Sequence, residues 1–310
     1  MAPMLEAEIY YCHFLWEEKS KWHKGLSYLG KFLMSMIILC RERPNIIIIQ
    51  LPPTPLLYVS MFYSILFNAK LICDCHNAMI QGSWIHWPFV QNFLTKTIVV
   101  VHNHFIFLEA REKLKFDPIV LRDGFENSKF SYSSTVLKKF GLIPGEYVIL
   151  PWNIAKDEPL SETFAAAEQM PEKKFVLTWH RERIPFSLRK IMPSNIVLTG
   201  FLEDEEFASV FFHAGAALVL TNREGTQLSG MAEAIAFNVP AVISDLKTTR
   251  ALYEDAACYV KNTPNSIIAG IRETFCMADV MRSSMKRIRN KTEIEISSQI
   301  GILKQFILLT

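Results

Sequence analysis

The stretch from Leu218 to Ser244 constrains the fold of this chain more than any other part of the sequence. Its residues, LVLTNREGTQLSGMAEAIAFNVPAVIS, form an apolar strand pattern, a polar turn, a helix pattern with small residues and a second apolar strand pattern. We expect the helix to span Leu228–Phe237 and to end before Pro240, because proline cannot continue a helix. This order predicts a strand–helix–strand unit, and therefore an α/β fold with a parallel sheet.

The beginning of that helix is suited to a ligand. Small residues such as Ser229 and Gly230 leave the first backbone N–H groups open, and a helix N-terminus favours an anion such as phosphate. Glu224 precedes the helix and Glu233 lies within it, and carboxylates accept hydrogen bonds from sugar hydroxyls. An anion site beside two hydroxyl acceptors indicates a nucleotide-sugar site. The alternative is that Glu224 stabilises a helix end electrostatically and Glu233 lies on a solvated face.

The rest of the chain repeats this alternation in two blocks. Continuous apolar runs at Ile46–Gln50, Lys70–Asp74 and Thr97–Val101 are typical of parallel strands covered on both faces. A further strand is expected at Ile9–Phe14. A polar stretch at 123–145 with glycines and a proline predicts a domain boundary. Together these patterns predict an α/β protein with two parallel-sheet units and a cleft between them, an arrangement that the family resemblance given below describes as two Rossmann-like domains.

We assign residues 1–140 to the first domain and 141–280 to the second. The amphipathic segment 281–310 is predicted to be a C-terminal helix, and whether it crosses back to the first domain stays open.

Polar side chains follow the strands of the first domain where each strand ends. Gln50 ends one strand, and Asp74, His76 and Asn77 follow the next. Ligands bind outside the carboxyl ends of strands in open α/β sheets. His76 could therefore hydrogen-bond a sugar hydroxyl or accept a proton from an acceptor, and Asp74 could orient its ring. The alternative is a strand-end histidine that bonds a loop carbonyl.

The composition excludes several classes of protein. A net charge of +2, from 33 basic and 31 acidic residues, argues against a dedicated nucleic-acid binder. The six cysteines do not form a zinc pattern, so we expect reduced thiols and no metal site. Acidic residues interrupt any apolar run at the N-terminus, which argues against a secretory signal and favours a cytoplasmic protein. They are Glu6, Glu8, Glu17 and Glu18.

Two segments raise the question of a membrane. The apolar run Leu56–Phe67 is too short to span a bilayer and is expected to be a buried helix. The segment Trp16–Cys40 mixes aromatic residues with lysines, as an interfacial amphipathic helix does. Such a helix would give a peripheral membrane contact. A basic outer helix of the first domain explains the pattern equally well.

The chain resembles a family of glycosyltransferases in several motifs. Glu224-Gly225, Glu233-Ala234 and the segment Asn238–Val242 resemble the donor-domain motifs of the group 1, sucrose-synthase-like family, which has the two-domain GT-B fold. The segment Thr199–Asp204 resembles an upstream loop of that family. In the first half, Gln50-Leu-Pro-Pro53 and Asp74-Cys-His-Asn77 resemble segments of β-mannosyltransferase-type enzymes that build lipid-linked sugars.

The resemblance implies a metal-independent hexosyltransferase of polysaccharide or glycoconjugate synthesis. It would move a sugar from a nucleotide-diphosphate sugar, its donor substrate, to a glycan or lipid-linked acceptor, with no cofactor. Glu224 would contact the donor sugar and take part in catalysis. His76 and Asp74 would take part in catalysis near the acceptor. Glu233 would hold the ribose. The implied donor-binding residues are Lys156, Arg181, Glu224, Gly225, Thr226, Gln227, Leu228, Ser229, Gly230 and Glu233.

Three departures from the family pattern leave alternatives open. Eight residues, not seven, separate Glu224 from Glu233, and Trp152 or Asn153 stands where the family has an arginine. The glycine-rich first loop of the family has no match, so the first domain is expected to be shortened. A catalytically weak relative that acts as a binding or scaffold protein, and a nucleotide-sugar epimerase on the same fold, are therefore the alternatives. Retention or inversion at the transferred sugar stays open as well.

Overall fold

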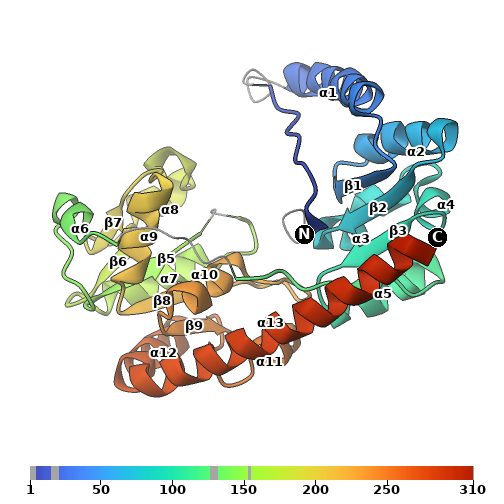
Figure 1. Ribbon diagram of the computed structural model, residues 1–310. Coiled ribbons are helices and arrows are strands. Elements are labelled where there is room, and N and C mark those ends of the chain that lie inside the picture. Colours follow the sequence, from blue (N-terminus) through green and yellow to red (C-terminus); the bar gives the residue numbers. More distant parts are fainter. Residues whose placement is uncertain (1–4, 15–20, 126–131, 153–154, 310) are drawn as a thin grey trace. The chain divides into compact units, whose positions relative to one another are not determined.

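The computed structural model describes residues 5–14, 21–125, 132–152 and 155–309, and it divides the chain into two compact α/β units (Figure 1). Unit 1 consists of residues 1–123 together with 294–310, and unit 2 consists of residues 124–293. The long helix α13 (Ala278–Leu309) therefore contributes residues to both units.

Unit 1 contains a four-stranded parallel sheet. Its strands lie in the order β1-β2-β3-β4, which is also their order in the sequence. They are β1 (Ile46–Leu51), β2 (Lys70–Cys75), β3 (Ile98–Val101) and β4 (Ile119–Val120). The helices of this unit are α1 (Lys21–Glu42), α2 (Pro55–Phe67), α3 (Asn77–Gln81), the 3₁₀ helix η2 (Ser83–His86), α4 (Val90–Leu94) and α5 (His104–Leu114).

Alternate residues of these strands are buried on opposite faces of the sheet, as the two-residue strand period requires. Ile47 and Ile49 of β1 belong to one hydrophobic cluster, together with residues of α2, α3 and α5. Ile72 of β2 belongs to a second cluster, together with Ile296 and Leu303 of α13. The last part of α13 thus covers one face of the unit 1 sheet, and continuous apolar strands are needed because both faces are covered.

Unit 2 contains a six-stranded parallel sheet in the order β10-β9-β8-β5-β6-β7. The strand order reverses between β5 and β8, which are neighbours although β6 and β7 lie between them in the sequence. This reversal is a topological switch point, the place where open α/β sheets bind ligands. The strands are β5 (Tyr147–Leu150), β6 (Lys174–Leu177), β7 (Ile196–Leu198), β8 (Ala216–Val219), β9 (Ala241–Ser244) and β10 (Cys258–Val260).

Helices cover both faces of the unit 2 sheet (Figure 1). Ile149 of β5 packs in a cluster with residues of α9 and α10, whereas its neighbour Val148 packs in a cluster with residues of α7 and α12. The helical elements are α6 (Thr135–Lys139), α7 (Leu160–Glu168), the 3₁₀ helix η3 (Arg181–Arg183), α8 (Phe186–Lys190), α9 (Asp204–Phe212), α10 (Ser229–Phe237), α11 (Lys247–Tyr253) and α12 (Pro264–Cys276).

The predicted α/β architecture with parallel sheets is confirmed, and local predictions differ from the structure in two places. Ile9–Phe14 forms no strand, because its backbone pairs with neither sheet. The helix predicted at Leu56–Phe67 is present as α2, but it is not buried all round. Its last turns leave Phe62, Ile65 and Leu66 exposed.

Candidate active site

The first turn of α10 packs directly on the switch point of the unit 2 sheet. A Cβ atom added to Gly230 would lie 2.7 Å from Pro151 Cγ and 3.1 Å from Val219 Cγ1. Pro151 follows β5 and Val219 ends β8, the two strands between which the sheet order reverses. Glycine is therefore required here for close packing of the helix on the sheet, whereas the sequence suggested that small residues make room for a ligand.

Polar groups gather at this end of α10 without protein partners. The first N–H groups of a helix have no carbonyl to bond within the helix, and no side chain caps α10. The N–H of Leu228 donates to Tyr253 Oη at 3.2 Å, which leaves the N–H groups of Ser229 and Gly230 as the open donors of the first turn. Within the described ranges, the buried atoms Thr226 Oγ1 and Gln227 Oε1 have no hydrogen-bond partner either. Together with the open N–H groups, these atoms can form hydrogen bonds with a ligand at the end of α10.

Glu233 lies in α10, just beyond its first turn, and its carboxyl group is half-buried. Burial raises the pKa of this carboxyl group to about 7, because removing water disfavours the charged form. No hydrogen bond or ion pair joins its side chain to any residue that the structure describes. Such a carboxylate gains most from hydroxyl groups that donate hydrogen bonds to it.

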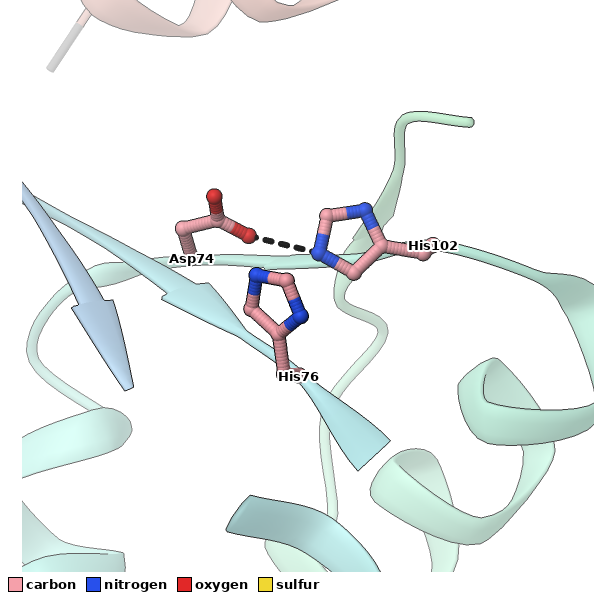
Figure 2. Close-up of side chains that lie close together, drawn as sticks. All are labelled: Asp74, His76 and His102. Atoms are coloured by element: carbon pink, nitrogen blue, oxygen red, sulfur yellow. Dashed lines mark ion pairs between the residues drawn. The ribbon is translucent and has the colours of Figure 1, made fainter. Parts of the chain in front are cut away.

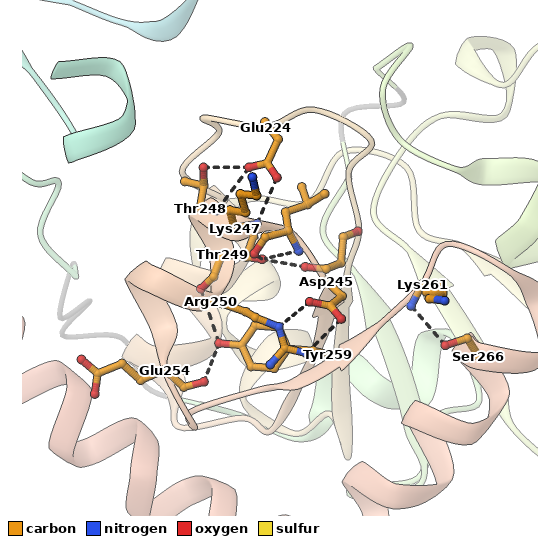
Figure 3. Close-up of polar contacts among 12 residues, drawn as sticks. Glu224, Asp245, Lys247, Thr248, Thr249, Arg250, Glu254, Tyr259, Lys261 and Ser266 are labelled. Atoms are coloured by element: carbon orange, nitrogen blue, oxygen red, sulfur yellow. Dashed lines mark hydrogen bonds and ion pairs between the residues drawn. The ribbon is translucent and has the colours of Figure 1, made fainter. Parts of the chain in front are cut away.

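Glu224 has a different environment. Its Oε1 accepts a hydrogen bond from the Lys247 N–H at 3.0 Å, and its Oε2 accepts from the Thr248 N–H at 3.2 Å and Thr248 Oγ1 at 2.9 Å (Figure 3). Burial acts to raise the pKa of Glu224, but these hydrogen bonds outweigh it and the pKa is lowered. Glu224 therefore caps the N-terminus of α11, which agrees with the electrostatic alternative drawn from the sequence, although for a different helix.

The basic residues predicted to bind the diphosphate lie in loops after two strands of unit 2. Lys156 follows β5 and Arg181 begins η3 after β6, and both side chains are exposed. Neither forms an ion pair with another described residue. Asn153 and the side chain of Arg183 lie outside what the structure describes.

Trp152 follows β5, at one of the two positions that could correspond to the family's arginine, and it is a structural residue. It is 2% exposed, and its Nε1 donates to the carbonyl oxygen of Leu218 at 2.7 Å. The hydrogen bond connects the loop after β5 to β8, so Trp152 stabilises the two strands at the switch point. Its indole carries no charge that could bind a diphosphate.

Unit 1 contains a cluster of histidines and carboxylates at the carboxyl ends of its strands. Asp74 and His76 lie at the end of β2, His102 follows β3, and Asp123 follows β4. Figure 2 shows Asp74 pointing at His102, with His76 beside the pair. The rings of His76 and His102 lie 4.6 Å apart between centroids, tilted by 52°.

Carboxylates face both nitrogens of His102. Nε2 lies 2.7 Å from Asp74 Oδ1, off the line of an ideal hydrogen bond, so the contact is an ion pair. Nδ1 lies 3.2 Å from Asp123 Oδ1 and 3.1 Å from the carbonyl oxygen of Leu121. Burial acts to lower the pKa of His102, but Asp123 and Asp74 outweigh it and raise the pKa to about 10. His102 is therefore a buried imidazolium at neutral pH.

The same pairing lowers the pKa of Asp123. Burial acts to raise it, but the hydrogen bond to His102 and the charge of that ring outweigh the effect of burial. Asp123 thus stays ionised together with His102 over the neutral pH range.

The pKa of His76 is shifted in the opposite direction to that of His102. Burial lowers its pKa, and the charge of His102 lowers it further, against the smaller effects of Asp74 and Asp123. Its Nε2 lies 2.7 Å from Gln50 Nε2. The sequence suggested that Asp74 orients His76; this is corrected by the structure, in which Asp74 pairs with His102 and Gln50 of β1 contacts His76.

The cluster suits acid–base chemistry better than a metal ion. Asp74, His76 and His102 each offer a ligand atom, and these atoms lie within 4.8 Å of one another. A histidine must be unprotonated to bind a metal. His102 faces carboxylates on both sides, and they raise its pKa, so a metal ion would have to compete with a proton that these carboxylates stabilise.

Sequence reasoning underrated two residues of this cluster. His102 follows β3 directly, as His76 follows β2, and that position relative to a strand end was the available signal. Asp123 begins the polar stretch 123–145, which was expected only to mark a domain boundary. His104 stacks on Phe107 at 5.4 Å between ring centroids, and His180 lies against Gly200 in unit 2, so neither joins the cluster.

No protein-family model matches this sequence, and no curated protein matches it at a significant level. Solved structures do match the fold. The chain superposes on sucrose-phosphate synthase from Thermosynechococcus elongatus with a TM-score of 0.70 and 15% identity, covering 91% of this chain and 78% of the synthase. HepE from Anabaena, in complex with UDP and glucose, gives a TM-score of 0.68 and 11% identity over 96% of this chain and 86% of HepE.

A glycosyltransferase from Rickettsia africae gives a TM-score of 0.66 and 11% identity, covering 97% of this chain and 85% of that enzyme. The matches extend over nearly the whole chain. At identities this low, the structural matches show the fold alone, and the chemistry must be argued from the residues of the site. The chain has the GT-B fold, with two Rossmann-like α/β units, as the sequence motifs had indicated.

Proposed function

We propose that this protein is a metal-independent glycosyltransferase that moves a sugar from a nucleotide-diphosphate sugar to a glycan or lipid-linked acceptor. Its place would be in polysaccharide or glycoconjugate synthesis. The donor binds to unit 2 and the acceptor hydroxyl binds near His76 in unit 1. HepE, which shares the fold, has been crystallised with UDP and with UDP-glucose, which supports a donor of this class.

The observation that carries the proposal is the half-buried, unpartnered carboxylate of Glu233 beside the open end of α10 at the switch point. Ribose hydroxyls can donate hydrogen bonds to this carboxylate. The N–H groups of Ser229 and Gly230 and the side chains of Thr226 and Gln227 can bind the diphosphate and the sugar. Lys156 and Arg181 supply positive charge from neighbouring loops. Helix-end amides and these cations would offset the charge that develops on the leaving diphosphate, without a metal.

Isothermal titration calorimetry with UDP, GDP and ADP tests this proposal. We expect heat of binding for at least one of them, together with a rise in melting temperature that grows with ligand concentration, because the ligand binds only the native state. EDTA in the buffer should leave both unchanged. If none of the three binds, the chain is a scaffold-type relative and the proposal is wrong.

An assay with a bound nucleotide sugar separates transfer from epimerisation. A transferase consumes donor in proportion to added acceptor, whereas an epimerase converts the donor with no acceptor present. Conversion of the donor sugar to its epimer in the absence of acceptor would therefore contradict the proposed transfer.

We also propose that α1 and α2 of unit 1 form a peripheral contact with an anionic membrane surface. α1 presents a row of large apolar side chains to solvent while it buries Ser27 and Ser35. The exposed row is Trp22, Leu26, Leu29, Leu33 and Ile37. Positions spaced in this way form one face of a helix. Trp16 and Lys19 of the predicted segment lie outside the described residues.

The middle of α1 carries a single positive charge. Lys31 is the one charged residue between 25 and 40, α2 carries none, and Glu42 at the end of α1 is paired with Arg41. An apolar face with one lysine and no unpaired carboxylate along it is complementary to anionic lipid. In the described part of the chain, no helix is long and apolar enough to cross a bilayer, so the proposed contact is with the surface.

Flotation on sucrose gradients tests this contact. We expect the protein to float with vesicles of phosphatidylcholine and phosphatidylglycerol, and less with phosphatidylcholine alone. Replacing Leu29 and Ile37 with Asn should reduce flotation several-fold with little change in melting temperature, because both side chains are exposed. Ile191→Asn, at an equally exposed position in unit 2, is the matched control. If the wild type does not float, or the double variant changes only the oligomeric state, the contact is with protein instead of lipid.

A further inference from the structure

Asp74 is the carboxylate closest to His76 in the sequence, but it forms an ion pair with His102 and not with His76. Asp74 is two residues before His76, and its side chain is 13% exposed. A histidine beside a free carboxylate gains charge, because the opposite charge favours the protonated ring. In this structure the carboxylate faces His102 instead.

His102 is held on both sides. Its side chain is 6% exposed, with Asp74 at Nε2 and Asp123 and the Leu121 carbonyl at Nδ1. These partners come from the ends of β2 and β4 and fix the ring between the two strands. Asp123 is also the last residue of unit 1 before the chain enters unit 2. Three strand ends therefore place a buried ring between two carboxylates.

Among the described residues, three titratable side chains affect the pKa of His76. Asp74 comes from β2, His102 from the end of β3 and Asp123 from the end of β4, and β1 contributes the neutral amide of Gln50. α3, which begins after His76, carries no titratable residue. Gln50 can hydrogen-bond either neutral tautomer of His76. Its NH₂ group donates to Nε2 when Nε2 carries no proton, and after the amide group rotates, its carbonyl oxygen accepts a hydrogen bond from a protonated Nε2. In the second arrangement Nδ1 is unprotonated and open to accept a proton.

We propose that His102 is a positioning residue that binds Asp74 and so leaves His76 a neutral ring, held by Gln50, to receive the acceptor hydroxyl. The acceptor role of His76 rests on the proposed glycosyl transfer. The role of His102 does not, because it is a property of the cluster in the free protein. Without the imidazolium, Asp74 and Asp123 would both face His76 and stabilise its protonated form, which cannot accept a proton.

Titration of the histidine Cε1–H signals by NMR tests the proposal on the full chain. In the wild type, we expect His102 to stay protonated up to its pKa of about 10, while His76 titrates below the ordinary value for histidine. In His102→Gln, the His76 pKa should rise by about one pH unit or more. Asp123→Asn keeps Asp74 paired with His102, so the His76 pKa should not rise. His104→Gln, an exposed ring outside the cluster, is the matched control and should change nothing.

Two outcomes would overturn the proposal. One is an unchanged or lower His76 pKa in His102→Gln, which a merely structural histidine would give. The other is loss of the His102 proton near neutral pH in the wild type. The wild-type titration gives this result even if His102→Gln fails to fold. The titration needs neither donor nor acceptor, so its result is independent of the nucleoside diphosphate titration that tests the proposed function.

Discussion

Replacing His76 with Ala is expected to lower sugar transfer by about 10²- to 10⁴-fold, the range that general acid–base groups contribute. The ring has a lowered pKa and is unprotonated at neutral pH, so it can accept the proton of the attacking hydroxyl. The rate of the wild type should fall below about pH 6.5, the ordinary pKa of histidine, as the ring becomes protonated. His76→Ala should remove that acid limb together with the rate.

A loss of structure would not explain this result. His76 precedes α3 and its side chain makes no cap hydrogen bond to that helix, so its removal should cost little stability. We expect binding of the nucleoside diphosphate to persist, because the residues proposed to hold it lie in unit 2. His104→Ala is the matched control for transfer. If His76→Ala transfers sugar at the wild-type rate, His76 has no part in the chemistry.

Replacing Glu233 with Gln is expected to stabilise the free protein while it weakens nucleoside diphosphate binding by about 10- to 100-fold. The loss corresponds to the value of a hydrogen bond to a charged group, about 1.5–3 kcal/mol. The gain arises because Gln removes a carboxylate that the fold desolvates and does not pair. Differential scanning fluorimetry and calorimetry on the same samples measure both effects.

The gain in stability must depend on pH. The folded-state pKa of Glu233, about 7, lies above its ordinary value of 4.5. The native state therefore binds a proton more tightly than the unfolded state, and the wild type loses stability as the pH rises between these two values. The full pKa shift of Glu233 corresponds to at most about 3 kcal/mol of folding stability, and screening by solvent makes the actual effect smaller. We expect Glu233→Gln to melt higher than the wild type at pH 8, and the difference to shrink at pH 5.

Glu224→Gln is the contrasting variant. Its pKa is lowered by hydrogen bonds from Lys247, Thr248 and Gly225, so its ionised form contributes stability above the ordinary pKa and this contribution is lost as the pH falls. At pH 8 we therefore expect Glu224→Gln to melt lower than the wild type and Glu233→Gln to melt higher. If Glu233→Gln melts lower as well and binds nucleotide normally, Glu233 is a structural residue and not the donor carboxylate.

The sequence by itself determined most of the strands and helices and named candidate residues at their ends. The isoleucine run of β1 and the small-residue helix α10 have local patterns, because side-chain burial repeats every two residues in a strand and every three or four in a helix. Asp74, His76 and Glu233 could be named as candidates for the same reason, since each has a fixed place relative to a strand or helix. Motif resemblance added the GT-B fold, which the structural matches confirm.

Only the tertiary structure decided which of these groups meet. The reversal of strand order beside β5 placed the open end of α10 at a switch point, and no local pattern encodes strand order. Folding paired Asp74 with His102 instead of His76, and it turned Glu224 onto the first turn of α11. These partners are separated in the sequence by more than twenty residues, so their contact depends on the packing of whole elements. That packing gave the two glutamates different environments: Glu224 accepts hydrogen bonds from the protein, and the half-buried carboxylate of Glu233 has no partner among the described residues.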